Sequence, residues 1–567
     1  LHIPPQTSTI ASHLPKALGA AFTIARQRRL GTQTDIPEDS IVLCSFGDAS
    51  SNHATACAAF NSAALADFQH LPCPILFVCE DNGLGISVRT PDGWVAARFQ
   101  GNPGIKYFGC EGLDIADTYE QARAAVNFVR TTRRPAMLHV RLVRLMGHAG
   151  SDVEQLYRTP EEIAETEAQD PLLRTAQALV AAGVLTPDEV LALYKDTRER
   201  VQALGEEAKS RPKIETAEAV MAPLAPYDAA QVGLEAVRTA EAAARGRFWD
   251  DRLPEDDRPR HMARLLNRAL GDLLVKYPEM MIFGEDVARK GGVYHVTADL
   301  SKRAGLGRVF NTPLDETTIL GLALGAAQQG MLPVPEIQYL AYLHNAIDQI
   351  RGEACSLQFF SNDQFRNPMV IRIASLAYQK GFGGHFHNDN SIAPLRDIPG
   401  LIIACPSNGR DAVGLMRTCM AAAKVSGRVS VFLEPIALYM TKDLHDNGDG
   451  IWSFDYPEPE FAVPLGQAST AVEGTGTDLT IITYGNGTWM SRRVARRIHS
   501  DHGVGIRIVD LRWIAPLPVE DMVREAKVTG RALVVDEGRR TGGMAEPIMT
   551  ALVEGCPHVE MARVTGH

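Results

Sequence analysis

Three common features are missing from this sequence, and each absence excludes a class of function. No apolar run approaches the ~18 residues that a membrane-spanning helix needs, so we expect no membrane partner. Nine cysteines are scattered over 567 residues with no C-x-x-C pair and no metal-ligand spacing, which favours reduced core cysteines in a cytosol-like compartment. Positive charge is not in excess, because the formal net charge is −11. This balance argues against nucleic acid or an anionic membrane as a partner.

The composition is that of an ordinary globular protein with several domains. Hydrophobic residues make up 45% and charged residues 22% of the chain, and its length allows large cores. The sequence opens at LHIPP without an initiator Met or signal peptide, and it stops at VTGH after a strand-like run. We therefore expect a fragment truncated at both ends. A cytoplasmic, bacterial-type location is expected, while the mitochondrial matrix stays open because targeting information would lie in the missing segment.

Two short apolar runs, Ile41–Phe46 and Pro74–Cys79, each stop at a polar residue, and an Ala-rich helical stretch separates them. Strand–helix–strand is the expected structure, and it sets the carboxyl ends of both strands side by side, where α/β sheets bind ligands. Asp48 follows the first run and Asn82 the second. Carboxylate and amide oxygens suit Mg²⁺, and a helix N-terminus after Asp48 suits phosphate. The alternative is that Asp48 caps a helix and Asn82 makes a turn.

The GD…DNG pattern resembles the GDG…NN signature of thiamine-diphosphate (ThDP) enzymes. The run CPILFVCEDNGLGIS, residues 73–87, is most similar to alpha subunits of the decarboxylating components of 2-oxo acid dehydrogenases, especially the branched-chain type. The resemblance implies that Asp48, Asn82 and the carbonyl of Leu84 hold Mg²⁺, and that Gly47 and Ala49 lie beside the cofactor diphosphate. Ala49 stands where the family has a third glycine, and about five extra residues lengthen the connection before the second strand.

Further residues of this half follow from the same resemblance. Ser8 and Ile10, ahead of an expected helix over 11–26, would lie beside the diphosphate and the thiazolium. After an expected helix over 117–130 and a strand over 136–143, the pattern R-x3-H-x2-SD…YR resembles the family's active-site loop. It implies that Arg144 faces phosphate and that His148 contacts the diphosphate and the reacting centre. A plain loop histidine is the alternative for His148.

The second half of the chain resembles the beta subunit of the same enzymes. The motifs on which this resemblance rests are GEDVARKGGVYHVT, TPLDETTILG and PVPEIQYLAY. ThDP chemistry needs a buried glutamate at the aminopyrimidine ring, and Glu316 matches it, with small and apolar residues following as in a buried helix start. Its neighbour Asp315 is not expected to take that role. Tyr342 falls where the family packs an aromatic against the pyrimidine, with core packing as the alternative.

A glycine-rich loop, residues 381–390, carries two histidines. It resembles the family's GG-x-YHSQS loop and implies that His387, rather than His385, enters the site. An imidazole there would position the carboxylate of a 2-oxo acid or move protons. The change of SQS to NDN alters the hydrogen-bond partners of that histidine.

The predicted fold class is α/β: a ThDP-binding fold with parallel sheets flanked by helices, plus a transketolase-type C-terminal domain. We expect a diphosphate-binding, alpha-like domain over 1–204, a linker over 205–258, a pyrimidine-binding, beta-like domain over 259–455 and a C-terminal domain over 456–567. Capping boxes at Thr159 and Thr186 predict two helix starts in the first domain.

The resemblance implies oxidative decarboxylation of a 2-oxo acid, branched-chain favoured, with acyl transfer to the lipoyl group of a dihydrolipoamide acyltransferase partner. ThDP and Mg²⁺ are the implied cofactors, and a homodimer of the fused alpha–beta chain is the implied assembly. Pyruvate and acetoin stay open as substrates. A catalytically silent paralogue is the alternative from another class, supported by Ala49, the lengthened connection and the NDN change.

Overall fold

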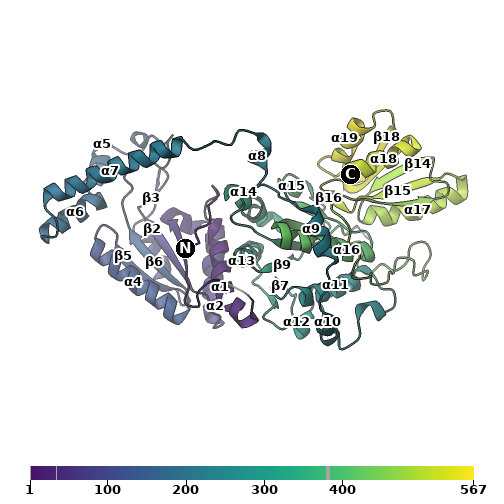
Figure 1. Ribbon diagram of the computed structural model, residues 1–567, viewed down its shortest axis with the longest axis horizontal. Coiled ribbons are helices and arrows are strands. Elements are labelled where there is room, and N and C mark those ends of the chain that lie inside the picture. The colour runs from purple at the N-terminus through teal and green to yellow at the C-terminus, as the bar shows by residue number, and fades with distance from the viewer. Residues whose placement is uncertain (1, 33–34, 379–383, 567) are drawn as a thin grey trace. The chain divides into compact units, whose positions relative to one another are not determined.

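The computed structural model describes residues 2–32, 35–378 and 384–566, and its chain divides into two compact units (Figure 1). The smaller unit consists of residues 9–25 and 35–222. The larger unit consists of residues 1–8, 26–34 and 223–567. The division falls at 222/223, inside the predicted linker.

The smaller unit is built on a four-stranded parallel sheet in the order β1-β2-β6-β5. Its strands are β1 (Val42–Gly47), β2 (Ile75–Asp81), β5 (Lys106–Glu111) and β6 (Ala136–Arg141). A 3-10 turn over Asp48–Asn52 and helix α2 (Ala54–Phe68) join β1 to β2. The predicted strand–helix–strand unit is therefore confirmed, and Gly47 pairs with Glu80 at the carboxyl ends of the two strands.

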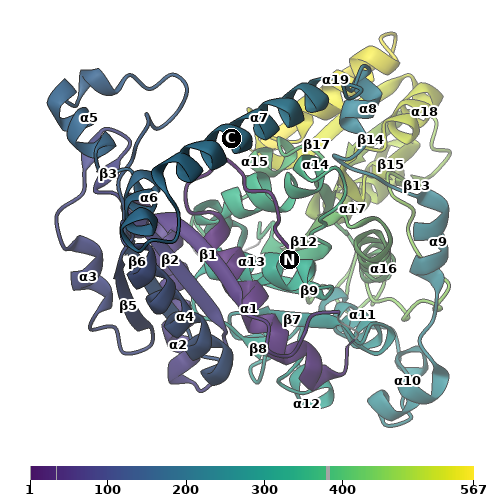
Figure 2. The same cartoon turned by 60° about the vertical axis from the view of Figure 1, so that its left-hand side comes forward.

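Helices cover both faces of this sheet (Figure 2). One face packs on α2 and on Leu14 and Leu18 of α1 (His13–Leu30), in a core that includes Phe60 and Phe77 with ring centroids 5.0 Å apart. The other face packs on α4 (Ile115–Thr132). The remaining elements near the sheet are short: β3 (Leu84–Gly85), β4 (Val88–Arg89) and α3 (Trp94–Phe99).

The smaller unit ends in a group of exposed helices. These are α5 (Pro160–Glu167), α6 (Pro171–Ala181), α7 (Pro187–Lys209) and α8 (Ala217–Met221). Thr159 and Thr186 form the capping boxes that the sequence predicts, each with proline in the first turn. No residue of α5, α6 or α7 is buried, so these helices add nothing to the core.

The larger unit contains a seven-stranded sheet in the order β16-β11-β12-β10-β9-β7-β8. All its pairings are parallel except that of β16 with β11. The strands are β7 (Met280–Gly284), β8 (Val309–Asn311), β9 (Leu332–Ile337), β10 (Met369–Ser375), β11 (Ile402–Ala404), β12 (Val429–Pro435) and β16 (Trp513–Ala515). Their residues are almost all buried, as expected of a parallel sheet covered on both faces.

The helices of this part are α9 (Ala229–Val237), α10 (Ala242–Trp249), α11 (Met262–Lys276), α12 (Leu300–Ala304), α13 (Glu316–Gln328), α14 (Leu357–Phe360), α15 (Ala393–Arg396) and α16 (Gly409–Ser426). Helices α9 and α10, within the predicted linker, contact α16 and α11 respectively. That stretch is thus packed onto the larger unit, because its apolar residues Val232, Ala236 and Trp249 are buried there.

The end of the chain forms a second sheet in the order β13-β15-β14-β17-β18. Its strands are β13 (Ser469–Glu473), β14 (Leu479–Thr483), β15 (Ile506–Asp510), β17 (Arg531–Arg539) and β18 (Glu560–Gly566), and its helices are α17 (Asn486–His502), α18 (Val519–Thr529) and α19 (Ala545–Gly555). Only β13 runs antiparallel to its neighbour. Among the described residues, no helix is long and apolar enough to cross a membrane.

Candidate active site

In the smaller unit, Asp48 lies at the point where β1 ends, and it is only 1% exposed. Its Oδ2 accepts a hydrogen bond from the hydroxyl of Thr90, and its Oδ1 accepts one from the backbone N–H of Asn82 at 3.4 Å. The side-chain oxygen of Asn82 in turn accepts from the backbone N–H of Leu84 at 3.1 Å. The structure therefore brings the three predicted metal ligands together at the carboxyl ends of β1 and β2.

The surroundings of Asp48 fit a cation. Within residues 2–32, 35–378 and 384–566, no ion pair to this buried carboxylate occurs, and buried charges in proteins are normally paired or bound to metal. The available donors are hard oxygens, as Mg²⁺ requires. The same described residues contain no cluster of three His, Cys, Asp or Glu side chains that could hold a metal. A metal at Asp48 would consequently depend on amide and carbonyl oxygens as well.

Ala49, which stands where the family has a third glycine, lies close to Gly85. A Cβ built on Gly85 would lie only 2.7 Å from the Cβ of Ala49. The methyl group of Ala49 thus occupies the space that a side chain at position 85 would need. Glycine at 85 allows this close approach, so the extra methyl at 49 is accommodated locally.

Arg144 and His148 lie on the loop after β6. The guanidinium of Arg144 donates to the carbonyl of Ile86 at 2.6 Å and to the hydroxyl of Tyr157 at 2.6 Å. Asp152 accepts from the backbone N–H of His148 at 2.7 Å and from Tyr157 at 2.6 Å. The hydrogen bond from Tyr157 is the main cause that lowers the pKa of Asp152.

These contacts explain the spacing of the R-x3-H-x2-SD…YR pattern, because Asp152 and Tyr157 tie its ends together. The imidazole of His148 is exposed. Ser8 and Ile10, on the segment before α1, are exposed as well, and Ile10 is 52% exposed. The sequence pattern contained Tyr157, but its role as the link between Arg144 and Asp152 was not predicted.

In the larger unit, Glu316 is the first residue of α13 and is 9% exposed. Asp315 caps this helix by accepting from the backbone N–H of Thr318 at 3.1 Å. Glu316 Oε2 accepts from the side-chain amide of Asn345 at 2.9 Å. The predicted buried helix start is confirmed, and the two adjacent acids have separate tasks because one caps the helix and the other faces Asn345.

A second carboxyl group affects the electrostatics around Glu316. Burial raises the pKa of Glu285, which follows β7, and the negative charge of Glu316 raises it further. A like charge nearby disfavours the ionised form of a carboxyl group. Glu285 is therefore the carboxyl group near Glu316 whose protonated form is favoured.

Aromatic residues surround His387. Its Nε2 lies 3.1 Å from the hydroxyl of Tyr342, and its ring centroid lies 4.6 Å from that of Tyr339. His385 instead stacks beside Phe386, with ring centroids 4.3 Å apart. The structure thus brings Tyr342 and His387 together and leaves His385 out of that contact; residues 381–383 of the predicted glycine-rich loop lie outside the described residues.

Three further residues near this contact were not singled out from the sequence. His344 lies 3.3 Å from Asp389 through Nε2 and Oδ2, and Asn345 holds Glu316. Burial opposes ionisation of Asp389, but hydrogen bonds from Ser391 and His344 outweigh it and lower the pKa of Asp389. The run YLAYLHN contained the signal, since it places Tyr339, Tyr342 and Asn345 three residues apart.

The fold and these two sites define a class of protein: an α/β protein with a buried aspartate where a strand of one parallel sheet ends and, in the other unit, a buried glutamate at a helix start. Family models agree with each part of the chain. Residues 2–217 match "Dehydrogenase E1 component", residues 258–441 match "Transketolase, pyrimidine binding domain", and residues 466–567 match "Transketolase, C-terminal domain".

Curated relatives narrow the class. Pyruvate dehydrogenase E1 component subunit beta of Staphylococcus epidermidis is 34% identical over 298 residues, which is 52% of this chain and 84% of the relative. The subunit of the same name from Staphylococcus aureus gives the same identity and coverage. The chain belongs to the E1 component family of ThDP-dependent 2-oxo acid dehydrogenases, with alpha-type and beta-type parts fused in one chain.

Proposed function

We propose that this E1 enzyme decarboxylates a branched-chain 2-oxo acid and passes the acyl group to the lipoyl group of a dihydrolipoamide acyltransferase. The single observation that carries the catalytic part is the buried Glu316, which starts α13 and keeps one carboxylate oxygen on Asn345. The branched-chain preference rests on the resemblance of residues 73–87 to that type of alpha subunit. Pyruvate is the second candidate, because the relatives from both Staphylococcus species carry that name.

The smaller unit would hold the cofactor diphosphate and Mg²⁺. Asp48, Asn82 and the carbonyl of Leu84 are the proposed metal ligands, supported by the absence of an ion pair to Asp48 within the described part of the chain. Backbone N–H groups following Gly47 and Ala49 suit phosphate oxygens at the start of a helical turn. Ser8, Ile10, Arg144 and His148 are proposed as further contacts to the cofactor.

Bound ThDP supplies a carbon nucleophile and an electron sink for the pair left by the departing CO₂. The residues of this chain are proposed to position the cofactor and the substrate and to hold or move protons. Glu316 is proposed to hold a proton at the ring nitrogen of the aminopyrimidine, helped by Asn345, which fixes its carboxylate. Removing the carboxyl would remove that proton contact while leaving the helix cap on Asp315 intact.

His387 is the proposed group that binds the 2-oxo acid carboxylate or moves a proton during acyl transfer. Its Nε2 lies 3.1 Å from the hydroxyl of Tyr342, and its ring packs against Tyr339. These two contacts restrain the orientation of the imidazole. Tyr342 itself is proposed to pack against the pyrimidine. His148 is proposed as a second histidine that contacts the reacting centre.

The proposal includes the assembly and the compartment. A homodimer of the fused chain, the four-part division at 204, 258 and 455, and a cytosol-like location are proposed with it. All nine cysteines are unpaired in the structure, eight of them buried, which supports a reducing compartment.

Reduction of an artificial electron acceptor tests the substrate and the reaction together. The purified protein would be supplied with ThDP and Mg²⁺ and with pyruvate, three branched-chain 2-oxo acids or acetoin. We expect turnover with a branched-chain acid that disappears when ThDP is omitted. Preference for pyruvate or acetoin would overturn the substrate proposal, and no turnover with any of them while ThDP is bound would favour the silent paralogue.

A further inference from the structure

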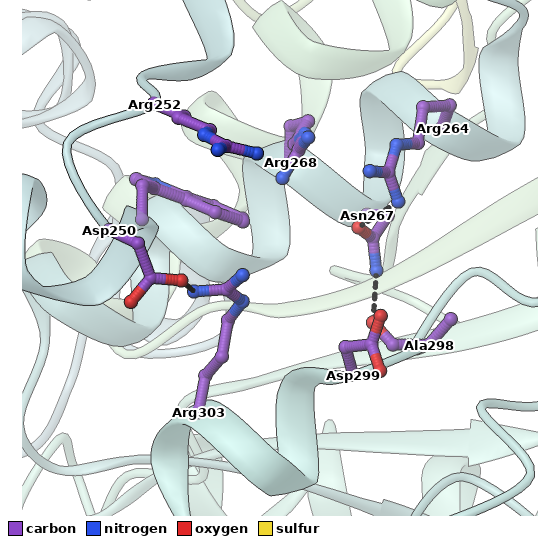
Figure 3. Close-up of a pocket in the computed structure, with 9 residues that line it drawn as sticks. Asp250, Arg252, Arg264, Asn267, Arg268, Ala298, Asp299 and Arg303 are labelled. Carbon is purple, nitrogen blue, oxygen red and sulfur yellow. Dashed lines mark hydrogen bonds and ion pairs between the residues drawn. The ribbon is translucent and has the colours of Figure 1, made fainter.

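A cavity of about 430 Å³ lies within the larger unit, between the end of α10, the first half of α11 and the start of α12 (Figure 3). It shares no lining residue with the Glu316 region. Four arginines line it, namely Arg252, Arg264, Arg268 and Arg303, together with two aspartates, Asp250 and Asp299. Two positive charges are thus in excess here, although the chain as a whole carries a net charge of −11.

Two of these arginines pack on the ring of Trp249. The guanidinium carbons of Arg268 and Arg303 lie 4.6 and 5.3 Å from the centroid of the Trp249 ring. Trp249 is 2% exposed, and its indole N–H donates to Asp272 at 2.9 Å, so the ring is fixed. Arg303 also donates to Asp250 at 3.0 Å. The wall of the cavity is therefore rigid and has guanidinium groups held in place.

The other two arginines, Arg252 and Arg264, do not pack on Trp249 in this way. Within the described ranges, the exposed side chain of Arg252 makes no hydrogen bond or ion pair, and Arg264 donates only to Asn267 at 3.3 Å. Asn267 is itself fixed, since its amide donates to the carbonyls of Val296 and Ala298 at 2.9 and 3.0 Å. Figure 3 shows Arg252 beside Arg268 at one edge of the cavity, with Arg264 and Arg303 at two others.

The arginine side chains at this cavity repel one another, and a bound anion would reduce that repulsion. Arg264 and Arg268 lie four residues apart on α11, a spacing at which like charges repel one another. Burial, followed by the charge of Arg264, lowers the pKa of Arg268. The buried Nε of Arg268 has no hydrogen-bond partner among the described residues, and a terminal nitrogen of the same guanidinium lies 3.9 Å from the carboxylate of Asp257. A bound anion would offset this repulsion.

The arrangement indicates the chemical class of the ligand. Guanidinium forks bind carboxylate and phosphate oxygens in pairs, and approach from several sides suits the tetrahedral phosphate better than the planar carboxylate. The volume is within the range of small-molecule sites and exceeds the needs of one inorganic phosphate. We propose that this pocket binds a small phosphate-bearing anion with at least two negative charges, of the size of a nucleotide or a polyphosphate.

Calorimetric titration of the full chain, saturated with ThDP and Mg²⁺ so that the proposed diphosphate site is filled, tests this site separately from the proposed function. ATP and inorganic tripolyphosphate are the two probes. Saturable binding of both would assign recognition to the phosphates, and tighter binding of ATP would add a contribution from the base. Because ThDP already fills the proposed diphosphate site, absence of saturable binding for both probes would overturn the proposal.

Substitutions of the arginines that line the cavity test whether the probes bind there. Arg252→Gln with Arg264→Gln should weaken probe affinity by about tenfold or more, because two charge-assisted contacts are lost. Arg252→Gln alone should weaken it less and keeps the fold, since the side chain is exposed. Arg247→Gln on helix α10, five residues before Arg252, is the matched control, because Arg247 is exposed and does not line the cavity; probe affinity should not change in this variant. Equal affinity in all three variants and the parent would contradict the assignment.

Discussion

Asp48 in the smaller unit and Glu316 in the larger unit are both buried acids at the junction of a strand or loop with a helical turn, but different donors satisfy them. Asp48 accepts on both oxygens, from Thr90 and from the backbone of Asn82. Glu316 accepts on Oε2 from Asn345, and no described residue donates to its Oε1. Glu285 adds a second acid beside Glu316, whereas Asp48 has hydroxyl and amide donors around it.

This difference matches two kinds of chemistry. A fully hydrogen-bonded carboxylate without a cation is suited to bind a metal in a fixed position. A carboxylate with one oxygen to which no described residue donates is open to a hydrogen bond with a ligand. We infer that the smaller unit anchors the cofactor and the larger unit carries out proton chemistry. The predictions below compare the two units, from the largest effect to the smallest.

Glu316→Gln should lower kcat by about 10²- to 10⁴-fold, because the amide cannot exchange the proton that a carboxyl group exchanges. Steady-state turnover with the best 2-oxo acid measures the effect. Asp315→Asn is the matched control: it changes the neighbouring acid, which only caps α13, and asparagine caps nearly as well. Comparable losses in both variants would show that the helix start, and not the Glu316 carboxyl, is what matters.

Glu434→Ala should destabilise the larger unit by about 3–5 kcal/mol, since it leaves a buried guanidinium with one carboxylate fewer. Arg372 is fully buried and donates to Glu434 at 2.6 Å and to Glu336 at 2.5 Å. Denaturant unfolding measures the change. Glu560→Ala breaks the exposed pair with Arg531 in the same unit and should change stability by less than about 1 kcal/mol. A loss below that limit for Glu434→Ala would contradict the importance of the buried pair.

Asp48→Asn should weaken ThDP affinity by about 10- to 100-fold in the presence of Mg²⁺, because it removes the only proposed carboxylate ligand. Titration of the apoenzyme with ThDP at fixed Mg²⁺ measures the affinity. Asp92→Asn, at an exposed position on the loop after β4, serves as the control and should leave affinity unchanged. Unchanged affinity in Asp48→Asn would assign the anchoring to other residues.

Gly85→Ala should cost about 1–3 kcal/mol through overpacking against Ala49, as the two Cβ atoms would be 2.7 Å apart. Thermal unfolding and ThDP affinity both measure it. Adding Ala49→Gly should restore both, since glycine at 49 removes the opposing methyl group. A double variant no better than Gly85→Ala alone would show that Ala49 is not what makes glycine necessary at position 85.

Local signals made much of the fold predictable. The apolar runs before Asp48 and Asn82, the capping boxes at Thr159 and Thr186, and the small residues after Glu316 all depend on neighbours in sequence. Helix ends shifted by a few residues, as in α1, which continues to Leu30. Turn and cap chemistry is local, and it carried over directly into the structure.

Contacts between distant residues were not predictable in this way. Tyr342 and His387 are 45 residues apart, and Arg372 and Glu434 are 62 apart, so the packing of elements distant in sequence determines whether they meet. The cavity of Arg252, Arg264 and Arg303 combines the segment after α10 with helices α11 and α12, and no sequence motif connects these arginines. The packing of α9 and α10 onto the larger unit likewise depends on partners far along the chain.

The division of tasks between the Asp48 and Glu316 sites is tested most directly by measuring kcat and the ThDP dissociation constant in the same preparations of Asp48→Asn and Glu316→Gln. The account predicts that Glu316→Gln loses turnover at saturating ThDP while its ThDP affinity stays within about threefold of the parent. It predicts that Asp48→Asn loses affinity and recovers most of its turnover when ThDP is raised to saturation. A Glu316→Gln variant that turns over normally, or an Asp48→Asn variant that binds ThDP as tightly as the parent, would contradict it.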